Sequence, residues 1–179
     1  ALAMQLFGPR RLSERVLELN ASDERGISVV RNKIIHFAKG IVGTADNDYP
    51  SPKFKIIILD EADAMTNEAQ SALRKVMESM TKITRFVFIC NYDHQIIEPI
   101  KSRCSLFKFK EISLEESQQK LKKISIHENL NITDEALYSI STISRGDFRR
   151  SINILQNLKY FSKKKINKSN VYKMTSYID

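Results

Sequence analysis

The chain has 179 residues, of which 42% are hydrophobic, and a formal net charge of +8. This length suits one domain, or one domain and a small second lobe, with a buried core. No apolar run approaches the roughly 18 residues of a membrane-spanning helix, so no membrane partner is expected. The positive charge favours a polyanionic partner such as nucleic acid, although many basic proteins bind none. The scattered cysteines and histidines lack the spacing of a zinc site or a disulfide framework, which fits a reducing compartment.

Residues 1–110 alternate between strand and helix patterns, which is typical of a parallel sheet flanked by helices. Strands are expected at 16–19, 54–59, 85–90 and 105–109. The run at 54–59 is interrupted only by Lys55, which predicts a central strand that is covered on both faces. The run at 85–90 predicts a second buried strand. Helices are expected at 1–7, before Gly40 and after the capping residue Thr66.

An all-helical pattern begins after Lys110. Apolar spacing predicts helices at 114–128, 133–144 and 147–160, capped by Ser113, Thr133 and Gly146. We therefore expect a sheet domain over residues 1–110, a helical lobe over 111–165 and the start of a further element over 166–179.

Acidic and amide side chains follow two of the expected strands. Asp60 and Glu61 come directly after the run 54–59, and Asn91 follows the next strand. In open α/β sheets, ligands bind outside the carboxyl ends of the strands. There, Asp60 can hold Mg²⁺ through water, Glu61 can polarise an attacking water, and Asn91 can orient that water. The pattern favours nucleotide hydrolysis over the alternative, an acidic helix start that only complements the helix dipole.

Five short segments, in order, resemble the sequence boxes of the AAA+ clamp loaders and in particular of the small subunits of replication factor C. They are Asn-Ala-Ser-Asp-Glu-Arg-Gly at 20–26, Leu-Asp-Glu-Ala-Asp at 59–63, Cys-Asn at 90–91, Ser-Arg-Cys at 102–104 and Gly-Asp-Phe-Arg-Arg at 146–150. Each box is short, but five in this order over residues 1–160 are specific. The loop after Gly40 and the segment 96–99 resemble the eukaryotic small subunits, with the subunit-four type as our expectation.

The resemblance implies an AAA+ parallel sheet flanked by helices and followed by a small all-helical lid. It makes Asp60 and Glu61 the Walker B pair and Asn91 sensor 1. Arg149 corresponds to sensor 2, which reaches from the lid to the γ-phosphate. Asn20 is either a switch that holds Glu61 away from water until DNA binds, or an ordinary turn residue at a strand end.

Arg103 resembles the arginine finger that serves the ATP of a neighbouring subunit, since a planar guanidinium can stabilise charge on phosphoryl oxygens. The alternative is an ordinary surface arginine. Arg25, Arg31 and Lys39 lie on or beside one helix and are expected to contact DNA phosphates without reading sequence.

The resemblance also implies the cofactors, the partners and the location. The cofactors are ATP and Mg²⁺. The partners are the other replication factor C subunits of a hetero-pentameric ring, the sliding clamp and primer–template DNA, in the nucleus. The implied function is to open the clamp and place it on DNA during replication and repair.

The chain departs from the family in one respect, because it contains no Gly-rich phosphate loop ending in Gly-Lys-Thr, and Gly8-Pro9-Arg10 is too short to replace one. We therefore expect a core without its first strand and phosphate loop, prone to aggregate and inactive as an ATPase in isolation.

Three other functions share part of this pattern, and the second of them is set aside. The first is a ring scaffold that only supplies Arg103 to a neighbour. The second is a DEAD-type helicase, because residues 60–63 spell that box, but Cys90-Asn91 stands where a helicase needs Ser-Ala-Thr. The third is a DNA-damage variant of the same loader, which shares every motif.

Overall fold

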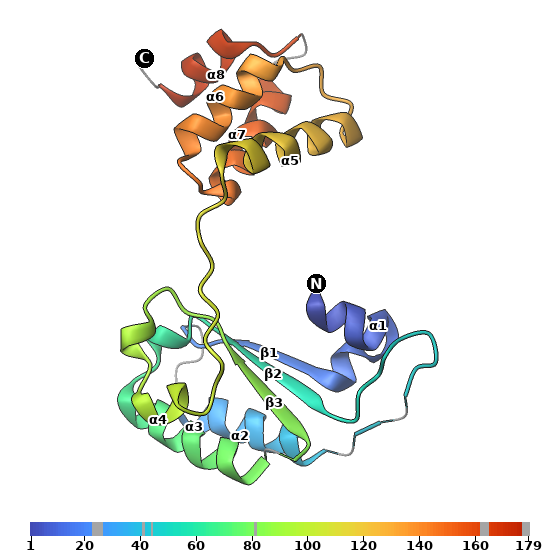
Figure 1. The fold of residues 1–179 in the computed structure, drawn as a ribbon, viewed down its shortest axis with the longest axis vertical. Coiled ribbons are helices and arrows are strands. Elements are labelled where there is room, and N and C mark those ends of the chain that lie inside the picture. The colour runs from blue at the N-terminus through green and yellow to red at the C-terminus, as the bar shows by residue number, and fades with distance from the viewer. Residues whose placement is uncertain (23–26, 41, 44, 81, 162–164, 177–179) are drawn as a thin grey trace. The chain divides into compact units, whose positions relative to one another are not determined.

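The computed structural model describes residues 1–22, 27–40, 42–43, 45–80, 82–161 and 165–176, without the side chains of 27–31 and 161. The chain divides into two compact units, Ala1–Leu106 and Phe107–Asp179 (Figure 1). Each unit has its own hydrophobic core.

The first unit contains a parallel sheet in the order β1-β2-β3. Its elements are α1 (Leu2–Arg15), β1 (Val16–Asn20), α2 (Ile27–Lys39), β2 (Lys55–Asp60), η1 (Ala62–Ala64), α3 (Asn67–Met80), β3 (Thr84–Phe88), η2 (Asp93–Gln95) and α4 (Glu98–Lys101). The register pairs Asn20 with Asp60 and Leu59 with Phe88, so the carboxyl ends of the strands meet at one edge. The predicted central strand is confirmed as β2, which is buried along most of its length.

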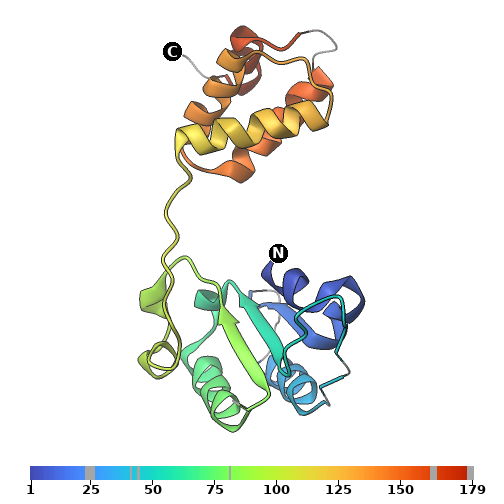
Figure 2. The same ribbon diagram turned by 45° about the vertical axis from the view of Figure 1, so that its right-hand side comes forward.

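Helices α2 and α3 cover one face of this sheet (Figures 1 and 2). The apolar side of α3 is buried as its spacing predicts, and Thr66 caps the helix by accepting a hydrogen bond from the Ala69 N–H. Burying such a stripe against a sheet is the main source of stability for an amphipathic helix.

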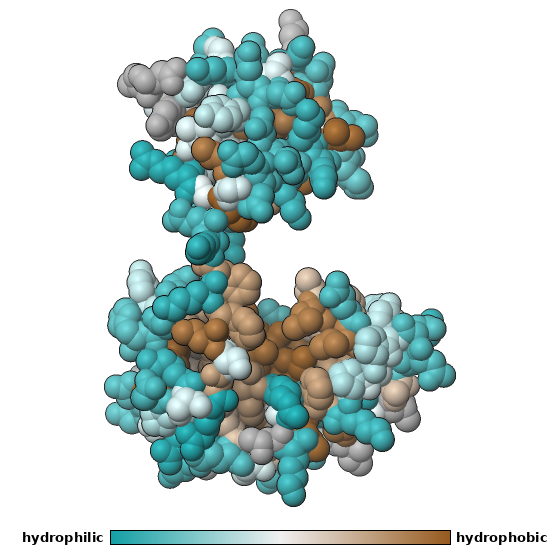
Figure 3. Space-filling model, in the orientation of Figure 1, coloured by the Kyte–Doolittle hydropathy of each residue, from teal (hydrophilic) through white to brown (hydrophobic). Residues whose placement is uncertain are grey.

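The prediction of a buried strand at 85–90 is wrong for one of its two faces. Val87 is 38% exposed and Ile89 49% exposed, whereas Phe86 and Phe88 pack into the core. Side chains alternate along a strand, and α3 packs against the face of β3 that carries Phe86 and Phe88, so the opposite face is left exposed. Apolar surface is accordingly visible over this sheet in Figure 3.

The predicted strand at 105–109 is also wrong, since this stretch is irregular and Leu106, Phe107 and Phe109 are exposed. An apolar run forms a strand only where another strand accepts its backbone hydrogen bonds. No strand among the described residues lies beside this segment.

Two buried cations, Arg15 and Lys55, donate hydrogen bonds to backbone carbonyl oxygens in and beside the loop between α2 and β2. Arg15 is 1% exposed and donates hydrogen bonds to the carbonyl oxygens of Gly43 (2.6 Å), Pro52 (3.1 Å) and Phe54 (3.3 Å). Lys55 Nζ donates to the Phe37 carbonyl oxygen at 2.8 Å. Burial, followed by the positive charge of Arg15, lowers the pKa of Lys55. The polar residue that interrupts the β2 run is therefore a structural anchor.

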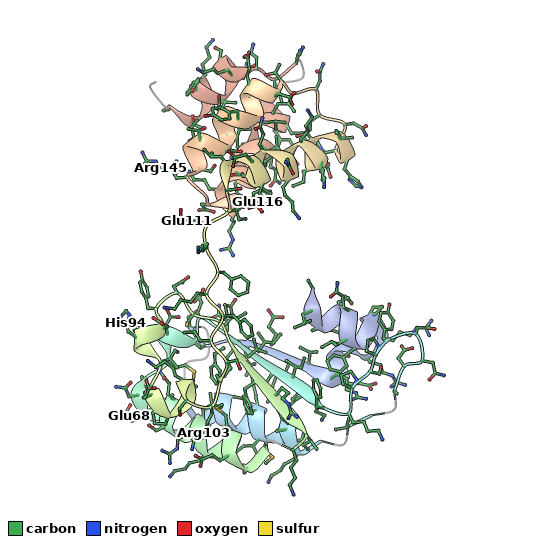
Figure 4. All side chains as sticks on the ribbon, viewed as in Figure 1. Glu68, His94, Arg103, Glu111, Glu116 and Arg145 are labelled. Atoms are coloured by element: carbon green, nitrogen blue, oxygen red, sulfur yellow. The ribbon has the colours of Figure 1, made fainter. Side chains whose placement is uncertain are left out.

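The second unit is a helical bundle of α5 (Leu114–His127), α6 (Asp134–Ser144), α7 (Phe148–Phe161) and α8 (Lys168–Thr175). Ser113 and Glu116 form a capping box at α5 (Glu116 is labelled in Figure 4), and Thr133 caps α6, as predicted. The Gly146 cap of α7 is wrong. Asp147 takes this role by accepting a hydrogen bond from the Arg150 N–H. The left-handed residue that ends α6 is Arg145, with φ 49°, and Gly146 follows it with φ 82°.

Candidate functional site

The carboxyl ends of β1, β2 and β3 are joined by backbone hydrogen bonds just beyond the strands. The Ala21 N–H donates to the Asp60 carbonyl oxygen at 2.8 Å. The Ala62 N–H donates to the Ile89 carbonyl oxygen at 3.0 Å, and the Ile89 N–H donates to that of Leu59 at 2.9 Å. The polar residues that follow the strands are therefore held on one rigid edge.

The predicted acidic pair lies at this edge. Asp60 ends β2 and is half-buried, and its Oδ1 accepts a hydrogen bond from the Glu61 N–H at 3.0 Å. Glu61 is exposed and adopts a left-handed conformation, with φ 51° and ψ 41°. Residues other than glycine hold such conformations at a cost of about 1–3 kcal/mol, and these outliers cluster at functional sites. Four other described residues apart from glycine also have a positive φ, and Glu61 is the one of the five that lies in the turn after β2, where the sequence predicts the catalytic water.

Asn91 follows β3 at the same edge and is exposed. Its backbone N–H and that of Tyr92 both donate to Asp63 Oδ2, at 3.2 and 3.1 Å. Asp63 thus ties the acidic turn to the turn that carries Asn91. Sequence reasoning missed this role, although Asp63 is the last residue of the acidic box and so carried a signal. Burial, with Asp63 and Asp93 adding negative charge, raises the pKa of the intervening Cys90 thiol.

Asn20 ends β1, opposite Asp60 in the register. Its Oδ1 accepts hydrogen bonds from the Ser22 N–H (2.9 Å) and the Ser22 hydroxyl (2.8 Å). Among the described residues, no hydrogen bond joins Asn20 to Glu61. The local turn is therefore present, and the switch remains a prediction.

Arg103 lies beyond α4, beside α3 (Figure 4), and not among the carboxylates at the strand ends. Its Nη1 donates to the Pro99 carbonyl oxygen at 2.7 Å. Its Nη2 donates to Glu78 Oε1, also at 2.7 Å, and the two side chains are 43% and 41% exposed.

Gln70, which the sequence analysis did not single out, connects the acidic turn with the segment that leads to Arg103. It is 1% exposed. Its Nε2 donates to the carbonyl oxygens of Met65 (3.2 Å) and Gln95 (3.0 Å), and its Oε1 accepts from the Ile97 N–H at 2.8 Å. A polar residue beside the apolar face of a helix was the only sequence signal for this contact.

The remaining predicted residues are not brought to the strand ends by the described contacts. Arg25 lies outside the described residues, and Arg31 lies in α2 with its side chain outside them. Lys39 is exposed at the end of α2. Arg149 is exposed in the first turn of α7, in the second unit.

Comparison with known proteins identifies the family. Residues 18–113, which hold the whole sheet edge just described, match the family described as "DNA polymerase III, delta subunit". The chain belongs to this family of clamp-loader proteins. The relatives also bear out the resemblance to replication factor C small subunits. Replication factor C subunit 4 of Arabidopsis thaliana is 55% identical over 159 residues, covering 88% of this chain and 47% of the relative.

Two further relatives extend this finding. Replication factor C subunit 4 of Homo sapiens is 52% identical over 158 residues, covering 88% of this chain and 44% of the relative. The small subunit of Picrophilus torridus is 45% identical over 181 residues, covering 100% of this chain and 54% of the relative. The chain thus spans about half the length of the curated relatives it matches.

Solved structures support the predicted fold class. The Thermotoga maritima RuvB Holliday junction branch migration motor superposes with a TM-score of 0.69 at 15% identity, covering 93% of this chain and 54% of that chain. At this identity the likeness concerns the fold alone. The AAA+ fold, a parallel sheet with flanking helices followed by a helical unit, is confirmed. Among the described helices, none combines the length and apolarity needed to cross a membrane.

Proposed function

We propose that this chain is part of a subunit of an ATP-dependent clamp loader. The subunit assembles with other replication factor C subunits, opens a sliding clamp and places it on primer–template DNA in the nucleus. One observation carries the proposal. In a chain of the clamp-loader family, Asp60, Glu61 and Asn91 meet at the carboxyl ends of neighbouring parallel strands, where α/β sheets bind their ligands.

The donor set at this edge fits Mg²⁺. Asp60 Oδ1 accepts a hydrogen bond from the Glu61 N–H, and no hydrogen bond among the described residues involves Asp60 Oδ2. A carboxylate oxygen of this kind is the ligand that Mg²⁺ and its bound waters prefer. Bound together with ATP, Mg²⁺ neutralises charge on the phosphate oxygens. The chain contains no Gly-Lys-Thr sequence, so the proposal assigns to it only the metal and water side of the site.

Each residue at the edge has a separate task in this proposal. Asp60 holds the hydration shell of the metal. Glu61 accepts a proton from the attacking water. Its side chain is exposed, so a water molecule can reach the carboxylate. Asn91 orients that water, and Asp63 fixes the Asn91 backbone. Asn20 would act on Glu61 by leaving its turn with Ser22.

Residues away from the edge act on a neighbouring subunit, on the γ-phosphate or on DNA in the proposal. Arg103 stabilises phosphate charge in the site of the adjacent subunit. Arg149 senses the γ-phosphate, so that hydrolysis changes the arrangement of the two units. Arg25, Arg31 and Lys39 contact DNA phosphates, and such contacts weaken as salt concentration rises.

The test is Glu61→Gln in the full-length subunit, in a complex whose other ATPase sites are inactivated by substitution. Because a general base contributes about 10²–10⁴-fold, turnover should fall by at least about a hundredfold while ATP binding persists. Glu68→Gln, an exposed carboxylate in the first turn of α3, is the matched control and should retain turnover (Glu68 is labelled in Figure 4). Unchanged turnover in Glu61→Gln would refute the catalytic role. If, in a second complex that keeps the adjacent site active, Arg103→Ala still impaired that site, the scaffold function would be supported instead.

A further inference from the structure

The guanidinium of Arg103 is fixed by its own chain although its proposed target lies on another subunit. It bridges two elements, through the Pro99 carbonyl oxygen in α4 and Glu78 Oε1 in α3, each at 2.7 Å. An arginine side chain has about 2 kcal/mol of rotamer entropy to lose when it is ordered. Two short hydrogen bonds therefore remove freedom that would otherwise be lost at the moment of contact with phosphate.

The contact leaves the reactive part of Arg103 available. A guanidinium has five N–H donors in a planar fork, and these two hydrogen bonds use one donor on each terminal nitrogen. The three remaining N–H groups and the positive charge can still face a phosphate. Glu78 and the Pro99 carbonyl oxygen thus each take one donor, on Nη2 and Nη1 respectively, and leave the second donor on each of these nitrogens and the Nε donor.

Stability does not account for the pair. Glu78 and Arg103 are each about two-fifths exposed, and ion pairs of this exposure contribute only about 0–1 kcal/mol to folding. Glu78 already has a partner within its own helix, because Arg74 Nε lies 3.5 Å from the same Oε1. The second bond to Arg103 therefore affects chiefly the direction of the guanidinium.

The backbone that carries Arg103 is anchored to the same helix. Gln70 accepts the Ile97 N–H at the start of the segment 97–103, and Glu78 holds Arg103 at its end. Gln70 and Glu78 are eight residues apart on α3, which corresponds to about 12 Å along the helix axis. Both ends of the segment are thus hydrogen-bonded to the same helix, α3.

We propose that Glu78 is a positioning residue that holds the Arg103 guanidinium in the orientation it needs to reach the nucleotide phosphates of the adjacent subunit. This rests on the proposed role of Arg103 in trans. The opposite effect, in which Glu78 sequesters Arg103 away from the neighbour, predicts the opposite sign for its removal.

The experiment measures turnover at the adjacent site in complexes that contain the full-length subunit. Glu78→Ala should lower kcat there by about tenfold, equivalent to about 1.4 kcal/mol, and leave KM for ATP unchanged. Glu78→Gln retains Oε1 as an acceptor and should restore most of the activity. Glu98→Ala is the matched control, since Glu98 forms a similar exposed pair with Lys101 at 3.1 Å and should leave kcat unchanged.

A double-substitution cycle separates positioning from general damage. If Glu78 acts through Arg103, adding Glu78→Ala to an Arg103→Ala complex has no further effect on kcat. A further loss would show that Glu78→Ala damages the subunit and would overturn the proposal, as would unchanged or raised turnover in Glu78→Ala alone. If Arg103→Ala itself left the neighbour unaffected, the in-trans function would fail together with this inference. A defect in Arg103→Ala but not in Glu78→Ala would refute this inference only.

Discussion

The left-handed backbone of Glu61 predicts that this residue lowers the free energy of unfolding of the first unit. Its φ of 51° is unfavourable for any side chain with a Cβ atom and favourable for glycine. We therefore expect Glu61→Gly to be more stable than Glu61→Ala. Both variants lack the carboxylate, so their difference reports the backbone conformation and not the lost charge.

The size of the effect follows from two opposing contributions. A left-handed conformation costs a non-glycine residue about 1–2 kcal/mol. Glycine also has more conformational freedom than alanine in the unfolded chain, which lowers the free energy of unfolding by about 0.4–1 kcal/mol. Taking the middle of each range, the glycine variant should therefore be more stable than the alanine variant by about 0.8 kcal/mol.

Native-state hydrogen exchange of the β2 amides is the appropriate assay, because the two units have separate cores and can open separately. Ala64→Gly is the matched control. Ala64 lies in the same turn without a positive φ, so glycine there should be destabilising, by about 0.5–1 kcal/mol. If Glu61→Gly were no more stable than Glu61→Ala, strain at Glu61 would be refuted. Both variants should also lose ATP hydrolysis in the assembled complex.

Two further predictions concern buried polar anchors. Gln70→Met should destabilise the first unit by about 3 kcal/mol, because three backbone groups lose a buried partner, and exchange of the Ile97 amide should accelerate. Gln70→Glu keeps the acceptor for Ile97 and should slow that exchange relative to Met; equal exchange in both variants would contradict the assignment. The second prediction concerns pH. Because folding lowers the pKa of Lys55 below 10.5, the unfolded chain binds more protons between the folded pKa and 10.5, so the free energy of unfolding should rise with pH across that interval. Urea unfolding from neutral pH to 10.5 should show this rise reduced in Lys55→Met, and equal pH profiles would exclude the effect.

Local and periodic features of the fold were predictable from sequence. The apolar run ending at Asp60, the capping residues Ser113 and Thr133, and the apolar side of α3 each depend on a few neighbouring residues. The meeting of Asp60, Glu61 and Asn91 also followed, because parallel strands bring their carboxyl ends to one edge.

Features that depend on distant partners were not predictable. The segment 105–109 has the composition of a strand, but strand formation requires a neighbouring strand, which a local pattern does not contain. Arg15 looks like an ordinary charged helix residue, yet it binds carbonyl oxygens that lie about 30 to 40 positions away. Its burial follows from the path of that loop, and only the folded chain reveals that path.

Helix α3 connects the two halves of the proposed chemistry. At its N-terminal end, Gln70 binds the Met65 carbonyl oxygen, directly after the turn that carries Asp60 and Glu61. Two turns further along, Glu78 binds Arg103. About 12 Å of α3 therefore separates the contact beside the turn of Glu61, the carboxylate proposed to activate water, from the contact to Arg103, the arginine proposed to serve the next site. Because catalysis depends on placement to within about an ångström, contacts from one helix to the segments that carry both groups would allow a subunit to present them in register.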